Sequence, residues 1–259
     1  MKISALVLTK NEEEVIKDCL KQLDFADEII VLDQNSSDDT KKIAKKYTDK
    51  IYTEYLPFDK ARNTLASYAK GDWLLYVDAD ERLDEDLIEE IKNTIKSSKL
   101  SAYYIPRRNM VLGKFLKHGG WWPDYVPRLF RRDKLEKWQG RVHESPQIVG
   151  EFGYFKSPIT HLTARSMKLM LEKSTRWAKI EAELNFENGA KKVTIPKVIK
   201  ALISEFTIRY LAKLGFLDGF VGLVESVYQA YHRAMVLTYL WELQNDSEGK
   251  FKQVTSELK

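Results

Sequence analysis

The amino-acid sequence predicts an α/β fold in which a mixed, mainly parallel sheet is followed by a helical C-terminal extension. Over residues 1–100, short apolar runs alternate with amphipathic segments of helical periodicity, and this order produces parallel strands joined by right-handed crossovers. From residue 166 to residue 243 the apolar residues mostly follow the helical repeat. We therefore expect one domain over residues 1–165, with halves at 1–100 and 101–165, then helices over 166–245 and a polar tail over 246–259.

The first half contains four predicted strands, each followed by a predicted helix. The strands are apolar runs bounded by polar or turn-forming residues, at residues 3–8, 29–32, 50–53 and 73–77. The helices carry apolar residues three or four apart, at residues 15–23, 40–47, 59–69 and 84–97. Either Ser37 or Asp38 is expected to cap the second helix. Ligands of such sheets bind at the carboxyl ends of the strands, where Asp33, Asp78 and Asp80 stand.

The alternation of strands and helices changes after residue 100. Four further strands are predicted there, at residues 102–107, 126–130, 141–144 and 158–161. The helical segment beyond them is expected to break near Asn188-Gly189 and Ile195-Pro196, and again at the surface over residues 215–219. No internal repeat and no low-complexity linker divides the chain.

Composition and charge restrict the class of protein. The chain of 259 residues is 44% hydrophobic and 31% charged, which excludes collagen-like and low-complexity proteins. The single cysteine, Cys19, excludes a disulfide within the chain and a cysteine zinc site. The first apolar run of six residues, Ile3–Leu8, is too short for a signal peptide. No stretch approaches the ~20 uncharged residues of a membrane span, so we expect a cytoplasmic protein.

The net charge of +4 is distributed unevenly. Residues 1–100 contain 16 basic and 22 acidic residues, or −6, whereas residues 101–259 contain 26 and 16, or +10. An excess of positive charge in the second half favours an anionic partner such as phosphate groups, a membrane surface or nucleic acid.

Asp78-Ala79-Asp80 is the sharpest chemical feature. Two carboxylates one residue apart, at the end of a buried strand, are a compact pair of hard oxygen ligands for Mg²⁺ or Mn²⁺. A metal there would neutralise a departing diphosphate. The alternative is a loop with turn-forming acids, because this pattern is common by chance.

Four sequence blocks together are more specific than the two acids. Thr9-Lys10-Asn11-Glu12 follows the first strand, Asp33 ends the second, Ala61-Arg62-Asn63 opens the third helix, and Asp78-Ala79-Asp80 follows the fourth strand. In this order, LVLTKNEE, IIVLDQNSSDDT and KARNTLASYAKGDWLLYVDADE resemble the nucleotide-binding half of inverting family 2 glycosyltransferases with the GT-A fold. The resemblance covers about the first hundred residues.

This resemblance implies roles for individual residues. Thr9, Glu12 and Asp33 would line the nucleoside pocket, with Asp33 accepting a base N–H. Arg62 would lie near the pocket or the diphosphate, Asp78 near the ribose and the metal, and Asp80 on the metal. From the residues alone, Asp33 is as well explained by an Asx-turn, Arg62 by a surface charge and Glu12 by the first turn of a helix.

The second half is expected to supply the acceptor site and the general base. An inverting transfer needs one carboxylate on the acceptor hydroxyl, and we select Glu144, with His143 as its neighbour and Asp124 as the second choice. GGWWPDYVPRLFRR and WQGRVHE are similar to a subgroup that includes lipopolysaccharide-core β-1,4-glucosyltransferases. The commonest family pattern has Glu-Asp where this chain has His143-Glu144.

Other side chains of this half could contact the acceptor. Trp121 and Trp122 could stack on sugar faces or pack in a core. Arg128 could hold a phosphate or belong to a solvated basic edge. His118, His161 and His232 show no metal-ligand spacing, so we expect them to be structural.

The C-terminal segment permits two interpretations. Residues 195–241 mix basic with large apolar side chains, as in helices that lie on anionic lipid. The same pattern is typical of helices that pack against their own domain or against a second copy in a homodimer.

The sequence therefore predicts a metal-dependent, inverting glycosyltransferase of lipopolysaccharide biosynthesis. Its donor would be a nucleotide-sugar, with UDP-glucose or a relative as first choice, and its acceptor a saccharide or glycolipid of the bacterial envelope. Peripheral contact with the inner membrane and a homodimer are possible, and no nucleic-acid motif is present. The alternatives are a nucleotidyltransferase acting on sugar phosphates and a non-catalytic protein that binds anionic glycans.

Overall fold

The computed structural model describes residues 1–140 and 144–246. The chain forms two compact units. The first unit contains Met1–Asn109 and Pro123–Thr163, and the second contains Met110–Trp122 and Ala164–Lys259. We call them the sheet unit and the helical unit. The α/β class and the C-terminal helices are as predicted.

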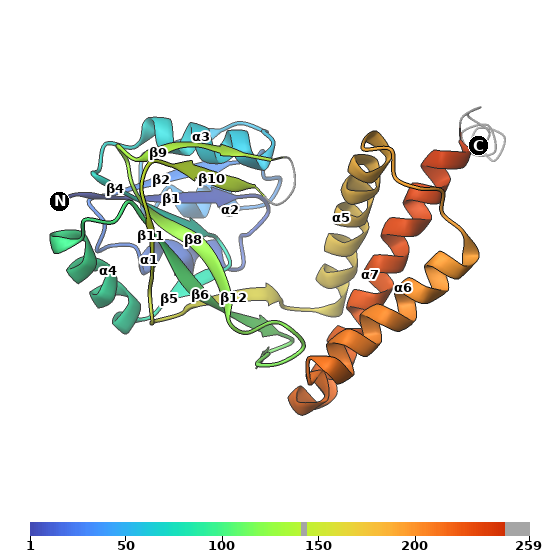
Figure 1. Cartoon of the computed structure of the whole chain (residues 1–259). Helices are drawn as coiled ribbons and strands as arrows, with labels where there is room; N and C mark the ends of the chain where they lie inside the picture. The colour runs from blue at the N-terminus through green and yellow to red at the C-terminus, as the bar shows by residue number, and fades with distance from the viewer. Residues whose placement is uncertain (141–143, 247–259) are drawn as a thin grey trace. The chain divides into compact units, whose positions relative to one another are not determined.

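A mixed sheet forms the body of the sheet unit (Figure 1). Its strand order is β3-β2-β1-β4-β8-β6-β12-β5, while β7 and β11 pair with β6 beside this path. The strands are β1 (Ile3–Thr9), β2 (Glu28–Asp33), β3 (Ile51–Thr53), β4 (Trp73–Asp78), β5 (Glu81–Leu83), β6 (Ala102–Val111), β7 (Lys114–Phe115), β8 (Asp124–Arg131), β11 (Phe152–Tyr154) and β12 (Ile159–Ala164). A separate ribbon joins β9 (Leu135–Gln139) to β10 (Ser145–Ile148).

The first four strands along the path are parallel, so their carboxyl ends share one edge. β1 pairs with β2 on one side and with β4 on the other. In this register Thr9 lies beside Asp33, and Leu8 lies beside Asp78. The predicted site residues of three different strands therefore meet at the same edge of the sheet.

Helices α1 (Ile16–Lys21), α2 (Thr40–Ala44), α3 (Phe58–Tyr68) and α4 (Glu85–Ser97) cover the two faces of this sheet. Alternate residues along each strand point to opposite faces, and each face has its own core. Ala5, Val7 and Val77 pack with residues of α1 and α4. Leu6, Leu8 and Tyr76 pack with α3 and with the ribbon residue Trp138.

Three details of the predicted elements change. Ile195-Pro196 begins a helix rather than breaking one, because proline in the first helical turn forfeits no intrahelical hydrogen bond. The N-cap of α2 is Asp39 rather than Ser37 or Asp38, and the Asp39 side chain makes no capping hydrogen bond. The Thr40 amide instead donates to Asp38 Oδ1 at 3.1 Å. Of the predicted strand 141–144, the first three residues lie outside the described residues and Glu144 is not in a strand.

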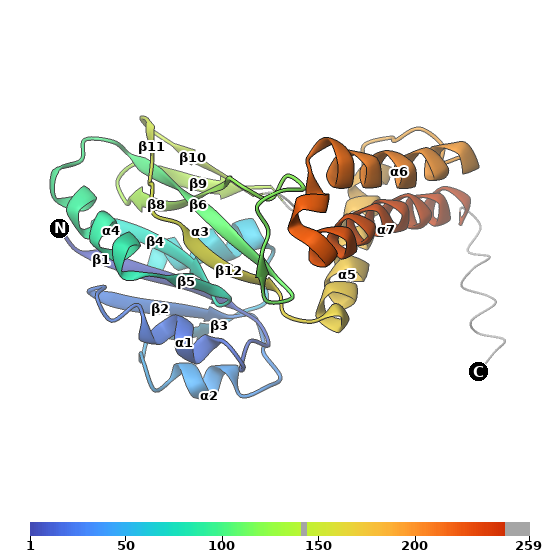
Figure 2. The same ribbon diagram turned by 90° about the horizontal axis from the view of Figure 1, so that it is seen from below.

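The helical unit contains α5 (Met167–Glu187), α6 (Ile195–Thr207) and α7 (Gly219–Asn245), which Figure 2 shows from below. Short π and 3₁₀ segments, η1 (Ile208–Ala212) and η2 (Gly215–Asp218), join α6 to α7. The helix break expected over residues 215–219 falls in this connection. Leu214 and Gly219, the two residues that flank η2, both adopt positive φ. Among the helices that the structure describes, none is long and apolar enough to cross a membrane.

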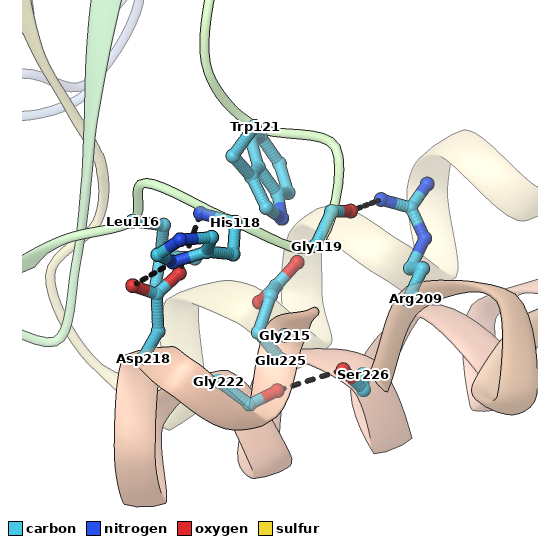
Figure 3. A pocket seen from close by; sticks show the side chains of 10 residues that line it. All are labelled: Leu116, His118, Gly119, Trp121, Arg209, Gly215, Asp218, Gly222, Glu225 and Ser226. Atoms are coloured by element: carbon cyan, nitrogen blue, oxygen red, sulfur yellow. Dashed lines mark hydrogen bonds and ion pairs between the residues drawn. The ribbon is translucent and has the colours of Figure 1, made fainter. Parts of the chain in front are cut away.

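A small cavity of about 10 Å³ lies inside the helical unit, between the 116–121 loop and α7 (Figure 3). Asp218 fastens the loop, because its carboxylate accepts from the His118 amide at 2.8 Å and pairs with the His118 ring at 3.1 Å. Arg209 donates to the Gly119 carbonyl at 3.2 Å. The chain approaches itself closely here, since a Cβ on Gly222 would lie 2.0 Å from the Gly215 carbonyl oxygen.

Glu225 is the unusual titratable group of this cavity. Burial raises the pKa of Glu225 to about 7, although a hydrogen bond from Gln229 and the charge of Arg209 act in the opposite direction. The Gln229 amide lies 2.7 Å from Glu225 Oε1. The folded protein therefore retains a proton on Glu225 at pH values where the unfolded chain has released it.

We expect this proton to make folding pH-dependent. Between about pH 4.5 and pH 7 the unfolded state binds fewer protons than the folded state, so the free energy of unfolding falls as the pH rises. Glu225→Gln should remove this component and stabilise the protein above neutral pH by at most about 3 kcal/mol. Urea unfolding at about pH 5 and about pH 8 measures the difference.

The matched control is Glu242→Gln, because Glu242 is an exposed carboxylate of the same helix. Its unfolding curve should follow the wild type at both pH values. Equal pH dependence in the wild type and in Glu225→Gln would show that Glu225 ionises normally.

Candidate functional site

Three buried polar side-chain atoms at the ends of β1 and β2 have no hydrogen-bond partner among the residues that the structure describes: Thr9 Oγ1, Asp33 Oδ1 and Gln34 Nε2. The other carboxylate oxygen of Asp33 accepts from the Ser36 amide at 3.1 Å, which fixes the orientation of the group. Leaving a buried donor or acceptor unpaired costs about 1–3 kcal/mol. A hydroxyl, an acceptor and a donor are thus held ready at one edge of the sheet.

The loops after β1 and β2 hold one another in place. Asn11 and Asn35 both adopt left-handed backbone conformations, which asparagine tolerates better than most residues. Asn11 Oδ1 accepts from the Ser37 amide at 2.8 Å, and the Glu12 amide donates to Thr40 Oγ1 at 2.8 Å. The Glu12 carbonyl accepts from the amides of Val15 and Ile16, so Glu12 closes the turn that leads into α1.

Asp78, at the end of β4, is held by two guanidinium groups. Arg128 Nη2 lies 2.5 Å from Asp78 Oδ2, and Arg62 Nη2 lies 3.4 Å from Asp78 Oδ1. Burial alone would raise the pKa of Asp78, but Arg128 and Arg62 outweigh it and lower this pKa to about 2. Arg128 also lies 2.5 Å from Glu81 Oε1, so one buried cation pairs with two acids, of which Glu81 is fully buried.

Arg62 of α3 contacts both Asp78 and Glu144, the predicted base. The Arg62 Nε lies 3.0 Å from Glu144 Oε1. The guanidinium lies over the rings of Trp138 and Tyr76, at 4.9 and 5.6 Å from their centroids. Arg62 is therefore a buried connecting residue of α3 rather than a surface charge.

A chain of polar contacts runs from Asp80 to Asp124. His161 Nε2 lies 3.3 Å from Asp80 Oδ2, and His161 Nδ1 lies 2.8 Å from Asn109 Oδ1. Asn109 Nδ2 donates to Asp124 Oδ2 at 2.9 Å. Arg107 pairs with the same oxygen of Asp124 at 2.7 Å. The spacing of residues in the sequence did not identify His161 as a site residue. Only the antiparallel pairing of β12 with β5 brings His161 beside Asp80.

The chemistry of these groups determines the protonation of the imidazole. The carboxylate of Asp124 accepts hydrogen bonds, so the amide nitrogen of Asn109 faces it and the amide oxygen faces His161. His161 therefore carries a hydrogen on Nδ1. Its Nε2 faces the Asp80 carboxylate at 3.3 Å.

Asp80 and His161 together form a donor pair that suits Mn²⁺ or Mg²⁺. The described residues contain no group of three or more potential His, Cys, Asp or Glu ligands. This agrees with the habit of these metals, which take one or two carboxylates from the protein and complete their shell with substrate phosphates and water. The residues present are compatible with a metal that binds together with a diphosphate.

The remaining predicted contacts are dispersed. Arg128 lies inside the protein rather than at an open surface. Trp121 and Trp122 belong to the helical unit, where Trp121 lies under Arg209 and Trp122 packs edge-on against Phe115. His143 lies outside the described residues.

Comparison with known proteins agrees with this geometry. The family model described as "Glycosyl transferase family 2" matches residues 4–159. An uncharacterized glycosyltransferase of Rickettsia typhi is 26% identical, over 93% of this chain and 87% of its own. The lipopolysaccharide core biosynthesis glycosyltransferase LpsC of Rhizobium meliloti is 23% identical, over 93% of this chain and 92% of its own.

Solved structures show weaker likenesses. TarS 1–349 of S. aureus is 15% identical with a TM-score of 0.45, over 96% of this chain and 92% of that one. Glucosyl-3-phosphoglycerate synthase of Mycobacterium tuberculosis, in complex with Mn²⁺, UDP-glucose and glycerol 3-phosphate, is 18% identical with a TM-score of 0.40. That likeness covers 51% of this chain and 57% of the other.

Removing the buried guanidinium should destabilise the sheet unit strongly. Arg128→Met leaves the buried carboxylate of Glu81 without its cation and leaves Asp78 with Arg62 alone, and breaking such a buried pair costs about 3–5 kcal/mol. Chemical denaturation of the purified variant measures this loss. Arg131→Met is the control, because the partner of Arg131 is the exposed Asp133 and the loss should be below about 1 kcal/mol. Similar losses in both variants would contradict the role given to Arg128.

Proposed function

The chain belongs to glycosyltransferase family 2, and we propose that it transfers a hexose, with glucose as first choice, from a UDP-linked donor to a saccharide of the bacterial envelope. The reaction of this proposal is metal-dependent and inverts the anomeric centre. The observation that carries it is the set of three unpartnered polar atoms at the ends of β1 and β2, close in the sheet register to the acidic end of β4.

The unpartnered atoms are compatible with uracil as the base. Asp33 Oδ1 can only accept a hydrogen bond and Gln34 Nε2 can only donate one. Uracil presents an N–H between two carbonyl oxygens, so its edge complements one acceptor and one donor. Guanine offers an N–H beside a carbonyl, and cytosine offers an amino N–H beside a ring nitrogen that accepts. Uridine, guanosine and cytidine nucleotides are therefore the three to compare.

The diphosphate of the donor would lie near Asp80 and His161. A divalent metal bound there with the diphosphate would neutralise the charge that develops on the leaving group. Arg107 pairs with Asp124, Asp124 holds Asn109, and Asn109 fixes the orientation of the His161 ring. Such outer contacts commonly change metal affinity by ~10–100-fold when they are removed. Asp124 acts in this proposal as a positioning residue.

Glu144 is the general base of the proposal. Its contact with Arg62 fixes the orientation of the carboxylate, and a general base must lie within hydrogen-bond reach of the proton that it accepts. Glu144 Oε2 would take the proton from the acceptor hydroxyl while the hydroxyl oxygen attacks the anomeric carbon opposite the departing phosphate. Attack from that side inverts the configuration.

The acceptor of the proposal is a saccharide or glycolipid of the bacterial envelope. This choice is supported by the sequence likeness to LpsC, a protein named for lipopolysaccharide core biosynthesis. An acceptor of this kind is held at a membrane, so the enzyme would meet it by peripheral contact with the cytoplasmic face of the inner membrane.

Calorimetric titration of UDP, GDP and CMP, each with and without Mn²⁺, tests the donor site. We expect UDP to bind most tightly and only weakly without the metal. Asp33→Asn should weaken UDP binding by about tenfold or more, because the new amide would present a donor to the base N–H. Asp80→Ala and His161→Ala should each abolish the effect of Mn²⁺ on UDP affinity.

Asp39→Asn is the control for the charge change, because Asp39 is an exposed acid in the turn after Asp33. Its UDP affinity should equal that of the wild type. A protein that binds none of the three nucleotides, with or without metal, would remove the proposal.

The role of Glu144 is tested by separating catalysis from binding. Glu144→Gln should lower the rate of UDP release from UDP-glucose, with envelope saccharide as acceptor, by ~10²–10⁴-fold, while UDP affinity stays within about threefold. Asp124→Asn should instead weaken Mn²⁺ binding and recover much of its rate at high metal concentration. The opposite pattern in the two variants would assign the base to Asp124.

A further inference from the structure

Helix α6 has two apolar stripes. Val198 and Ala201 pack against a core that contains Leu237 and Leu240 of α7. Ile195, Ile199, Leu202 and Ile203 form a neighbouring stripe, since Ile199 lies four positions from Ile195 and from Ile203 and three positions from Leu202. All four are exposed, and none of the residues of α6 is fully buried. The stripe that packs and the stripe that is exposed are thus different residues.

The exposed apolar surface continues into the connection to α7. Leu211, Leu214 and Leu217 are about half exposed, and Phe220, in the first turn of α7, is 78% exposed. Ile195 and Ile203 reach 77% and 62%. One turn beyond Phe220, Leu223 and Val227 line an open apolar groove of about 410 Å³ beside α5. Contiguous exposure on this scale marks an interaction surface rather than scattered apolar residues.

The same segment is strongly basic. Residues 191–217 contain six basic residues, Lys191, Lys192, Lys197, Lys200, Arg209 and Lys213, and one acidic residue, Glu205, so their net charge is +5. Glu205 pairs with Arg209 at 2.6 Å and therefore does not offset the lysines. A cluster of lysines beside an apolar stripe attracts a surface that carries negative charge and accepts hydrocarbon side chains.

From the juxtaposition of this apolar stripe with these lysines, we propose that α6 and the segment to Phe220 bind an anionic lipid bilayer surface. Apolar side chains would enter the boundary between headgroups and acyl chains, while the lysines contact lipid phosphates. We call this the α6 surface. Concentrating the enzyme at a membrane would raise its encounter rate with a membrane-held acceptor; this consequence rests on the proposed function, whereas the binding itself does not.

A second copy of the chain is a poorer partner for the α6 surface. A symmetric dimer uses the same patch on both subunits, so it would place the lysines of one copy against the lysines of the other. Like charges brought together in this way repel one another, whereas an anionic surface would attract the same lysines. Charge therefore selects lipid over self-association.

Co-sedimentation with vesicles tests the inference. The full chain should pellet with vesicles of phosphatidylcholine and phosphatidylglycerol and much less with phosphatidylcholine alone. Lys192→Gln with Lys200→Gln should weaken the partition constant by about 30-fold, since each lysine near such a surface contributes roughly five- to sixfold and the two factors multiply. Ile199→Gln with Ile203→Gln should weaken it by at least about tenfold at unchanged charge.

The control variant carries Val149→Gln and Lys42→Gln together. These are an exposed β-branched apolar residue and an exposed lysine of the sheet unit, like the isoleucines and lysines replaced in α6 and beside it. This variant should pellet like the wild type. Circular dichroism establishes that each variant is folded, and all of the substituted side chains are exposed or half-exposed.

Absence of lipid-dependent pelleting in the wild type would overturn the inference. Concentration-dependent dimerisation that the Ile199→Gln, Ile203→Gln variant abolishes, without vesicle binding, would assign the α6 surface to a protein contact and overturn it as well. UDP titration of the same variants keeps the two proposals apart. Vesicle binding without nucleotide binding would leave the α6 surface standing and remove the proposed function.

Discussion

The buried charge at the end of β4 is the interaction on which the site depends. Asp78 is the last residue of β4, and the other residues of this strand are buried. A carboxylate there loses part of its hydration, which is unfavourable unless a positive charge lies beside it. Arg128 and Arg62 supply the compensating charge from β8 and α3. Because Arg128 also binds Glu81 and Arg62 also binds Glu144, four elements of the sheet unit are joined through these two guanidinium groups.

A second network of polar contacts orients the groups around Asp80. Asp124 lies on β8, Asn109 lies on β6 and His161 lies on β12. Their contacts run across neighbouring strands of one sheet, so the rigidity of the sheet is transmitted to the imidazole ring. In one part of the site, Arg62 and Arg128 pair with acidic side chains. In the other part, the Asp80–His161 pair suits a cation brought by a ligand.

The helical unit follows different physical rules. Its interior is closed by close approaches of glycine backbone and by the polar contacts of Asp218, His118 and Arg209. Its surface departs from the usual amphipathic helix, since α6 exposes large apolar side chains beside a cluster of lysines. Such exposure is unfavourable in water and is best understood as the cost of keeping a surface available for a partner.

The sequence by itself determined the order of strands and helices and the acids at the strand ends, because hydrophobic periodicity and turn residues are local signals. Asp33, Asp78 and Asp80 could therefore be placed at one sheet edge from their spacing alone. Only the tertiary structure decided which side chains complete them. His161 reaches Asp80 through the pairing of β12 with β5, and Arg128 reaches Asp78 from β8. Pairing between strands that lie far apart in the chain is set by the packing of the whole sheet, and no local pattern of residues encodes it.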